Sequence, residues 1–92
     1  MKVLILGKLK EERKFEIAED MIRQNNDTPI NPVKVLYALP EDLNYSDFTA
    51  VLIELVRISD SVMLLEGYKT ELAANIALIN ADKSEKGIYT KI

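Results

Sequence analysis

Two stretches of the chain are continuous runs of hydrophobic residues that end in glycine. Residues 2–7 read KVLILG, and residues 61–67 repeat the pattern as SVMLLEG. Uninterrupted apolar runs of this length are typical of strands that are buried on both faces of a parallel sheet. We therefore predict a buried strand in each stretch.

Three other segments carry apolar residues at steps of three and four, which predicts helices. These segments are residues 11–26, 48–58 and 70–81. Ser46 or Asp47 is expected to cap the second helix, and Thr70 is expected to cap the third. The apolar faces of the third helix are supplied by Leu72, Ala73, Ile76, Leu78 and Ile79.

Two further strands complete the predicted order. Residues 28–33 (TPINPV) contain two prolines, each of which removes a ladder donor, so this strand is short or lies at an edge. Residues 39–47 are expected to form a loop, and residues 86–92 a final strand. The alternation of strands and helices predicts one domain over residues 1–92, with a three-layer, flavodoxin-like or Rossmann-like α/β fold. We expect a parallel sheet of about four strands, with three helices.

Composition narrows the classes of function. The net charge is −3 and the basic residues are scattered, which argues against nucleic acid or a membrane surface as a partner. The chain has no cysteine and no histidine, so we expect no disulfide, no metal and no cofactor. No apolar run is long enough for a signal peptide or a membrane span, and we expect a cytoplasmic protein.

Parallel sheets bind ligands at the carboxyl ends of their strands, and three predicted loops meet there. The candidate ligand-binding residues are Gly7, Lys8, Asn31, Pro32, Gly67, Tyr68 and Asn75. Lys8 would meet a phosphate, or would be a solvated lysine. Tyr68 would stack on a base or sugar, or would form a lid over the sheet edge. The two glycines permit either close approach of a ligand or a tight turn.

Glu71 is the candidate catalytic residue. It follows the buried strand of residues 61–67 and precedes the third helix, where it shares a helix face with Asn75. It is either a nucleophile or ligand contact at the mouth of the sheet, or an acidic residue in the first turn that interacts with the helix dipole.

The second predicted helix is apolar over more than one stripe, which indicates burial on more than one side. In so small a domain this favours a homodimer, with Leu52, Ile53 and Val56 as the candidate interface. The alternative is deep burial of these residues within one chain.

Four stretches of the chain, taken in order, resemble a known set of motifs. They read MKVLILG, INP, ALPEDLNYSDF and SDSVMLLEGY, and the matched positions are Gly7, Asn31, Pro32, Tyr45, Asp60, Gly67 and Tyr68. Their order and spacing resemble a small uncharacterised family related to the nucleoside 2-deoxyribosyltransferases. The resemblance implies a flavodoxin-like or Rossmann-like sheet. It also implies that catalytic relatives direct a glutamate nucleophile against the sugar C1′ and release the free base.

The chain departs from that pattern where the chemistry of the relatives takes place. Without a gap, the nucleophilic glutamate falls on Ala77, whereas a gap of six residues after Gly67 places it on Glu71. We therefore predict a catalytically impaired domain that binds a nucleoside- or nucleotide-like small molecule or acts through self-assembly. One alternative is an active N-glycosidic hydrolase or transferase that uses Glu71. Another is a pure protein-interaction module whose pocket is plugged by Leu4, Leu6 and side chains of the third helix.

Overall fold

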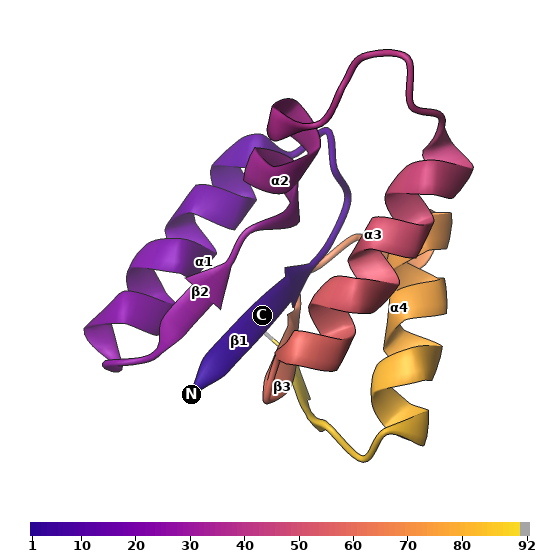
Figure 1. The fold of residues 1–92 in the computed structure, drawn as a ribbon. Helices are drawn as coiled ribbons and strands as arrows, with labels where there is room; N and C mark the ends of the chain where they lie inside the picture. Colours follow the sequence, from indigo (N-terminus) through magenta and orange to yellow (C-terminus); the bar gives the residue numbers. More distant parts are fainter. Residues whose placement is uncertain (91–92) are drawn as a thin grey trace.

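The protein folds into four strands and four α-helices in a computed structural model that describes residues 1–90 (Figure 1). The elements in chain order are β1 (Lys2–Leu6), α1 (Glu12–Gln24), β2 (Thr28–Ile30), α2 (Pro32–Ala38), α3 (Tyr45–Ile58), β3 (Ser61–Leu64), the 3₁₀ turn η1 (Tyr68–Thr70), α4 (Leu72–Lys83) and β4 (Gly87–Thr90). The predicted final strand extends to Ile92, and its last two residues lie outside the described ones.

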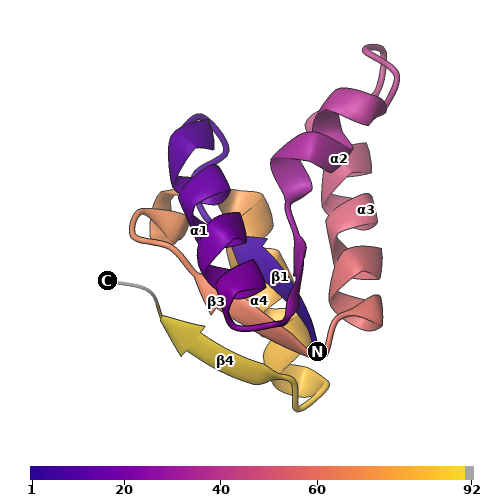
Figure 2. The same ribbon diagram turned by 90° about the vertical axis from the view of Figure 1, so that its left-hand side faces the viewer.

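The four strands form one parallel sheet in the order β2-β1-β3-β4. Side chains of β1 alternate between two hydrophobic clusters. Val3 and Ile5 pack with α1, whereas Leu4 and Leu6 pack with α3 and α4. Helices therefore cover both faces of the sheet, as Figures 1 and 2 show. The predicted three-layer parallel α/β fold is confirmed, and β2 lies at an edge of the sheet, as Pro29 within it favours.

One helix was missed by the sequence analysis. The strand predicted over residues 28–33 ends at Ile30, and Asn31 and Pro32 begin α2: the Asn31 side chain accepts a hydrogen bond from the Val33 backbone N–H at 3.0 Å. Asparagine at the N-cap followed by proline at the first helical position is a regular start signal. The structure therefore has four helices where three were predicted.

The predicted caps of the other helices were also wrong. Asn44 caps α3 in a capping box, in which Asp47 at the third helical position accepts a bond from the Asn44 backbone. Thr70 lies in η1, where its hydroxyl donates to the Gly67 carbonyl instead of capping α4.

Helix α4 faces the core with small residues. Its buried positions are Ala73, Ala74, Ala77 and Ala81. By contrast, Leu72 and Ile79, which belong to the predicted apolar faces of this helix, are 62% and 55% exposed. Alanines allow a helix to lie close to the sheet and to α3, and the bulky side chains are then left on the outer side.

The predicted interface residues on α3 divide between core and surface. Leu52 and Val56 are buried in the cluster between α3, α4 and the sheet, so they are not available to a second copy. Ile53 is partly exposed and lines a groove beside α4. The broad apolar cover of α3 thus arises largely from burial within one chain. Within residues 1–90, no helix has the length and apolar character needed to cross a membrane.

Candidate functional site

The order of the strands defines where a ligand site is expected. In the sheet order β2-β1-β3-β4, the chain first adds β2 on one side of β1 and then returns to add β3 and β4 on the other side. The direction in which strands are added therefore reverses between β1 and β3, which is where ligands bind in such sheets. The loops after these two strands lie against each other, since the Leu65 backbone N–H donates to the Leu6 carbonyl at 2.8 Å. The candidate site is therefore built from these two loops and the N-terminal ends of α3 and α4.

Glu71 lies at this point and its carboxylate is held by two donors. Its Oε1 accepts a bond from the Leu9 backbone N–H at 2.9 Å. Its Oε2 accepts a bond from the Tyr45 hydroxyl at 2.6 Å. The same hydroxyl oxygen accepts a bond from the Ala73 backbone N–H at 2.7 Å, so the single hydroxyl proton is directed to Glu71. One carboxylate thus ties the loop after β1 to the starts of α3 and α4.

The Tyr45 hydroxyl remains protonated over a wide pH range. Partial burial, and then the hydrogen bond to the Glu71 carboxylate, raise the pKa of Tyr45 above its usual value, although the bond from Ala73 acts in the opposite direction. Tyr45 therefore acts as a hydrogen-bond donor that orients Glu71, and not as a phenolate base at neutral pH.

We expect Tyr45→Phe to change how stability depends on alkaline pH. A pKa that is raised in the folded state contributes stability below the unfolded pKa of about 10, and this contribution is lost as the pH rises through the folded pKa. At pH 7 the variant should lose on the order of 1 kcal/mol, because the hydrogen bonds to Glu71 and Ala73 are removed. Urea unfolding between pH 7 and 11 should show the two proteins converging at alkaline pH. A constant difference over the whole range would contradict the assignment, and Tyr89→Phe on the edge strand serves as the control.

Asn75, a predicted ligand contact, braces the loop that carries Glu71. Its side-chain amide donates to the backbone carbonyls of Lys69 at 3.0 Å and Glu71 at 2.9 Å, with a longer contact to the Tyr68 carbonyl. The amide nitrogen is therefore engaged by the backbone. It fixes the turn before α4 and does not bind the Glu71 carboxylate.

The two candidate glycines are required by contacts within the protein. A Cβ at Gly7 would lie 3.1 Å from the Cβ of Leu65 and 3.3 Å from the ring of Phe15. Gly67 has a φ of +92°, which other residues rarely adopt, and it lies beside the side chain of Lys8. Gly7 thus permits close packing, and Gly67 permits the turn that brings the two loops together.

Leu9 lies over the end of the sheet at the candidate site. Its side chain packs against both hydrophobic clusters, one on each face of the sheet. Among the partly buried residues that pack against these clusters, Leu9 alone contacts both. Leu4 and Leu6, which were proposed as a plug, are ordinary core residues of β1. The side chain that covers the strand ends is therefore that of Leu9. Tyr68, which follows β3, packs against the α3–α4 side of the core.

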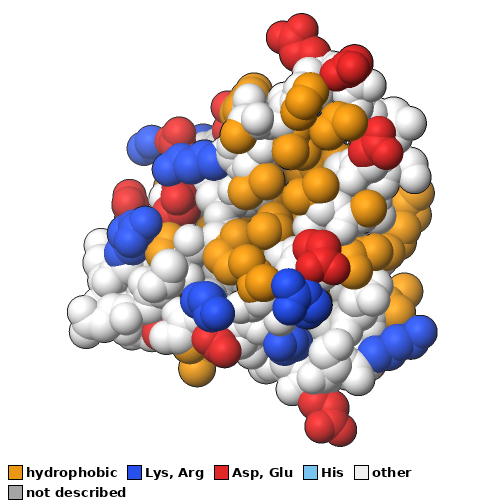
Figure 3. All heavy atoms as spheres, in the orientation of Figure 1, with side chains coloured by type: hydrophobic (Ala, Val, Ile, Leu, Met, Phe, Trp, Pro, Cys, Tyr) orange, Lys and Arg blue, Asp and Glu red, His pale blue; other side chains and the backbone are white. Residues whose placement is uncertain are grey.

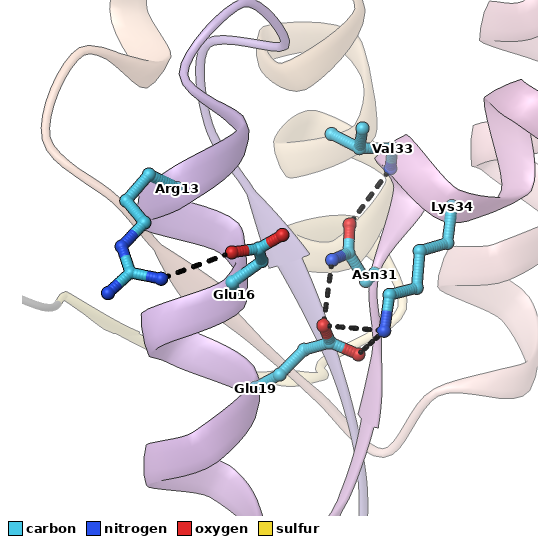
Figure 4. A network of polar contacts seen from close by, with 6 residues as sticks. All are labelled: Arg13, Glu16, Glu19, Asn31, Val33 and Lys34. Atoms are coloured by element: carbon cyan, nitrogen blue, oxygen red, sulfur yellow. Dashed lines mark hydrogen bonds and ion pairs between the residues drawn. The ribbon is translucent and has the colours of Figure 1, made fainter.

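Asn31 and Pro32 lie on the far side of β1, at the end of β2. Figure 4 shows that the Asn31 amide donates to Glu19 of α1, at 3.1 Å, and that Lys34 pairs with the same carboxylate. The Asn31 oxygen caps α2, so both ends of this side chain are engaged. These two residues join α1 to β2 and α2, and within residues 1–90 neither of them is hydrogen-bonded to Glu71.

Sequence reasoning placed Glu71 at the strand ends but missed its partners. Tyr45 was matched by the resemblance without receiving a role, and a tyrosine at the start of the helix that precedes β3 is the signal that could have found it. Leu9 binds Glu71 through its backbone, which has no signature in the sequence.

Fold and site together define a small parallel α/β domain with an oriented carboxylate at the point where the winding of its sheet reverses. The chain belongs to the family described as Domain of unknown function (DUF4406), which it matches over residues 3–90. No curated protein matches it.

Proposed function

We propose that this domain binds a nucleoside- or nucleotide-like small molecule at the junction of β1 and β3, as a catalytically impaired relative of the nucleoside 2-deoxyribosyltransferases. The observation that supports the proposal is the Glu71 carboxylate, which is fixed in orientation by Leu9 and Tyr45. A fixed anionic acceptor at the strand ends suits a ligand that carries hydroxyl or amino donors.

The carboxylate of Glu71 retains capacity for a ligand. An ionised carboxylate has about four acceptor positions, and the two protein donors occupy two of them. Sugar hydroxyls or the amino group of a base can bond to the others. Lys8, in the loop after β1, is near enough to Gly67 to supply a positive charge for a phosphate group at the same edge.

The glutamate of the relatives aligns with Ala77 without a gap and with Glu71 when a gap is allowed. The burial of Ala77 favours the alignment with Glu71. Ala77 is fully buried between α4 and the sheet, where a side chain would have no access to a ligand. Glu71 is only partly buried and lies at the edge. The gapped alignment therefore gives a position that can take part in binding.

The second candidate function is an N-glycosidic hydrolase, which is favoured by the orientation of Glu71. Attack of the carboxylate on C1′ would form a glycosyl ester while the C1′–N bond breaks and the base leaves with a proton from solvent. Water would then hydrolyse the ester and regenerate the carboxylate. Binding requires only the donors seen around Glu71, whereas turnover also requires proton transfer to the base, so binding is the better-supported function.

We expect thermal unfolding in the presence of deoxynucleosides, ribonucleosides, their monophosphates and free bases to identify a stabilising class. A ligand at a hundred times its dissociation constant adds about 2.7 kcal/mol, and each kcal/mol raises the Tm of a domain of this size by roughly 4–8 °C. Glu71→Gln should remove most of the shift because it replaces half of the carboxylate with a donor.

The matched control is Glu66→Gln, which changes an exposed acid in the same loop and should leave the shift intact. No shift with any class, or an equal shift in Glu71→Gln, would contradict the proposal. Release of free base by the wild-type protein, lost in Glu71→Gln, would instead establish the second candidate.

A further inference from the structure

The loop that joins β1 to α1 crosses the end of the sheet at the candidate site (Figure 1). Its residues 8–10, which we call the strap, are attached to the rest of the protein by few bonds. The Glu11 N–H donates to the Lys8 carbonyl at 2.9 Å, which closes a local turn. Apart from this turn, the strap backbone makes one hydrogen bond within residues 1–90, from the Leu9 N–H to Glu71 Oε1 at 2.9 Å. Glu71 is therefore the side chain that fastens the strap.

The strap covers the strand ends with a single apolar side chain. Leu9 is partly buried and packs against the cluster on each face of the sheet. It thus fills the position between the ends of β1 and β3 at which a ligand would approach Glu71. A ligand that enters between these strand ends needs the space that Leu9 occupies.

The open groove on the face shown in Figure 3 does not lead to Glu71. Hydrophobic side chains gather on this face between α2 and the start of α3. A groove of about 180 Å³ lies between the two helices and is lined by residues from Leu36 to Phe48. Neither Leu9 nor Glu71 belongs to its lining. Access to the Glu71 carboxylate from the strand ends therefore depends on the strap.

We propose that the strap is an autoinhibitory gate, which Leu9 and Glu71 hold closed and which opens before a ligand binds. This inference rests on the proposed function, because it concerns entry to the same site. When the strap is open, a hydroxyl or amino group of the ligand donates to Glu71 Oε1 in place of the Leu9 N–H. The carboxylate then exchanges one donor for another, and the displaced N–H is solvated. Gly7, at the start of the loop, is a residue type that tolerates the change of backbone angles at a hinge.

The contacts of the strap determine how strongly the closed form is favoured. Opening breaks one hydrogen bond and exposes the buried part of one leucine, which together favour the closed form on the order of a hundredfold. The apparent dissociation constant of a ligand rises by the same factor, because only the open fraction binds. Global unfolding of a small domain is rarer by at least about another hundredfold, so opening of the strap is a separate, local event.

Native-state hydrogen exchange tests the gate without a ligand. The Leu9 amide should exchange through local opening, with a protection factor on the order of a hundred and a rate that dilute urea does not change. The matched control is the Leu65 amide, which lies at the same edge of the sheet but donates to the Leu6 carbonyl of β1. It should be protected at least about a hundredfold more strongly and should exchange only with global unfolding. Equal protection of the two amides, or exchange of Leu9 that Glu71→Ala does not accelerate, would overturn the proposal.

Weakening the gate should strengthen binding. The probes are the deoxynucleosides, ribonucleosides, monophosphates and free bases of the thermal unfolding experiment. For a compound that stabilises the protein, Leu9→Ala should lower the apparent dissociation constant roughly tenfold, because it removes most of the side chain that closes the site. Leu55→Ala truncates another partly buried leucine that packs against the same α3–α4 cluster, and it should leave this constant unchanged.

The outcomes separate the gate from the proposed function. Binding by Leu9→Ala that is tighter than binding by wild type and Leu55→Ala would support the gate. Equal or weaker binding by Leu9→Ala would overturn it and leave the proposed function intact. Binding by none of the three proteins would contradict the proposed function, whereas exchange of the Leu9 amide decides by itself whether the strap opens.

Discussion

Replacing Ala77 with glutamate is expected to remove a large part of the protein's stability at neutral pH. Ala77 has no exposed surface and lies in the cluster formed by the sheet, α3 and α4. A glutamate there would bury a charge without a partner and would also force apart a closely packed helix. Together these effects cost on the order of 4 kcal/mol or more, against a total stability of roughly 5–10 kcal/mol for a domain of this size.

Urea unfolding at pH 5 and pH 8 would measure this cost and identify its cause. Burial raises the folded-state pKa of a carboxyl above its unfolded value near 4.3. The destabilisation relative to wild type should therefore grow as the pH rises from 5 to 8. Ile79→Glu, on the exposed side of the same helix, should change stability by less than about 0.5 kcal/mol. If Ala77→Glu were as stable as this control, position 77 would not be buried. The ungapped alignment, which places the glutamate of the relatives at position 77, would then be supported.

Truncation of Phe15 to alanine is expected to cost about 3–5 kcal/mol. Phe15 is fully buried on α1, in the cluster with Val3 and Ile5, and its ring lies close to Gly7 at the end of β1. Because α1 supplies most of the cover on this face of the sheet, the lost ring would leave a cavity that its neighbours cannot fill without moving the backbone. The loss should therefore approach the upper part of the range.

The comparison for Phe15→Ala is Ile17→Ala, two residues away on the exposed side of α1. Guanidinium unfolding at 25 °C should give a midpoint near that of wild type for Ile17→Ala and a far lower one for Phe15→Ala. Similar midpoints for the two variants would show that α1 does not cover the sheet through Phe15.

Sequence patterns predicted the strands well because β1 and β3 are buried on both faces and therefore read as unbroken apolar runs. They did not show which side of α4 is buried, because apolar residues surround much of this helix and only its alanines are fully buried. The existence of the helix was predicted correctly. Residue size did not indicate which side of the helix is buried, since close packing against the sheet selects small side chains. At the candidate site, topology was enough to place Glu71, but the bonds from Tyr45 and Leu9 depend on contacts between segments distant in sequence.

The central place of β1 in the sheet has a consequence for how the chain folds. β1 is synthesised before the other elements of this domain, yet one of its two neighbours, β3, begins only at Ser61. The edge of β1 that pairs with β3 therefore stays unpaired while α1, β2, α2 and α3 are synthesised. Pairings of such sequence separation are slow to form, and unpaired apolar strands are prone to association with other chains. Once α1 and β2 are made, they can cover one side of β1. A nascent chain is therefore most exposed to association with other chains while α3 is being synthesised.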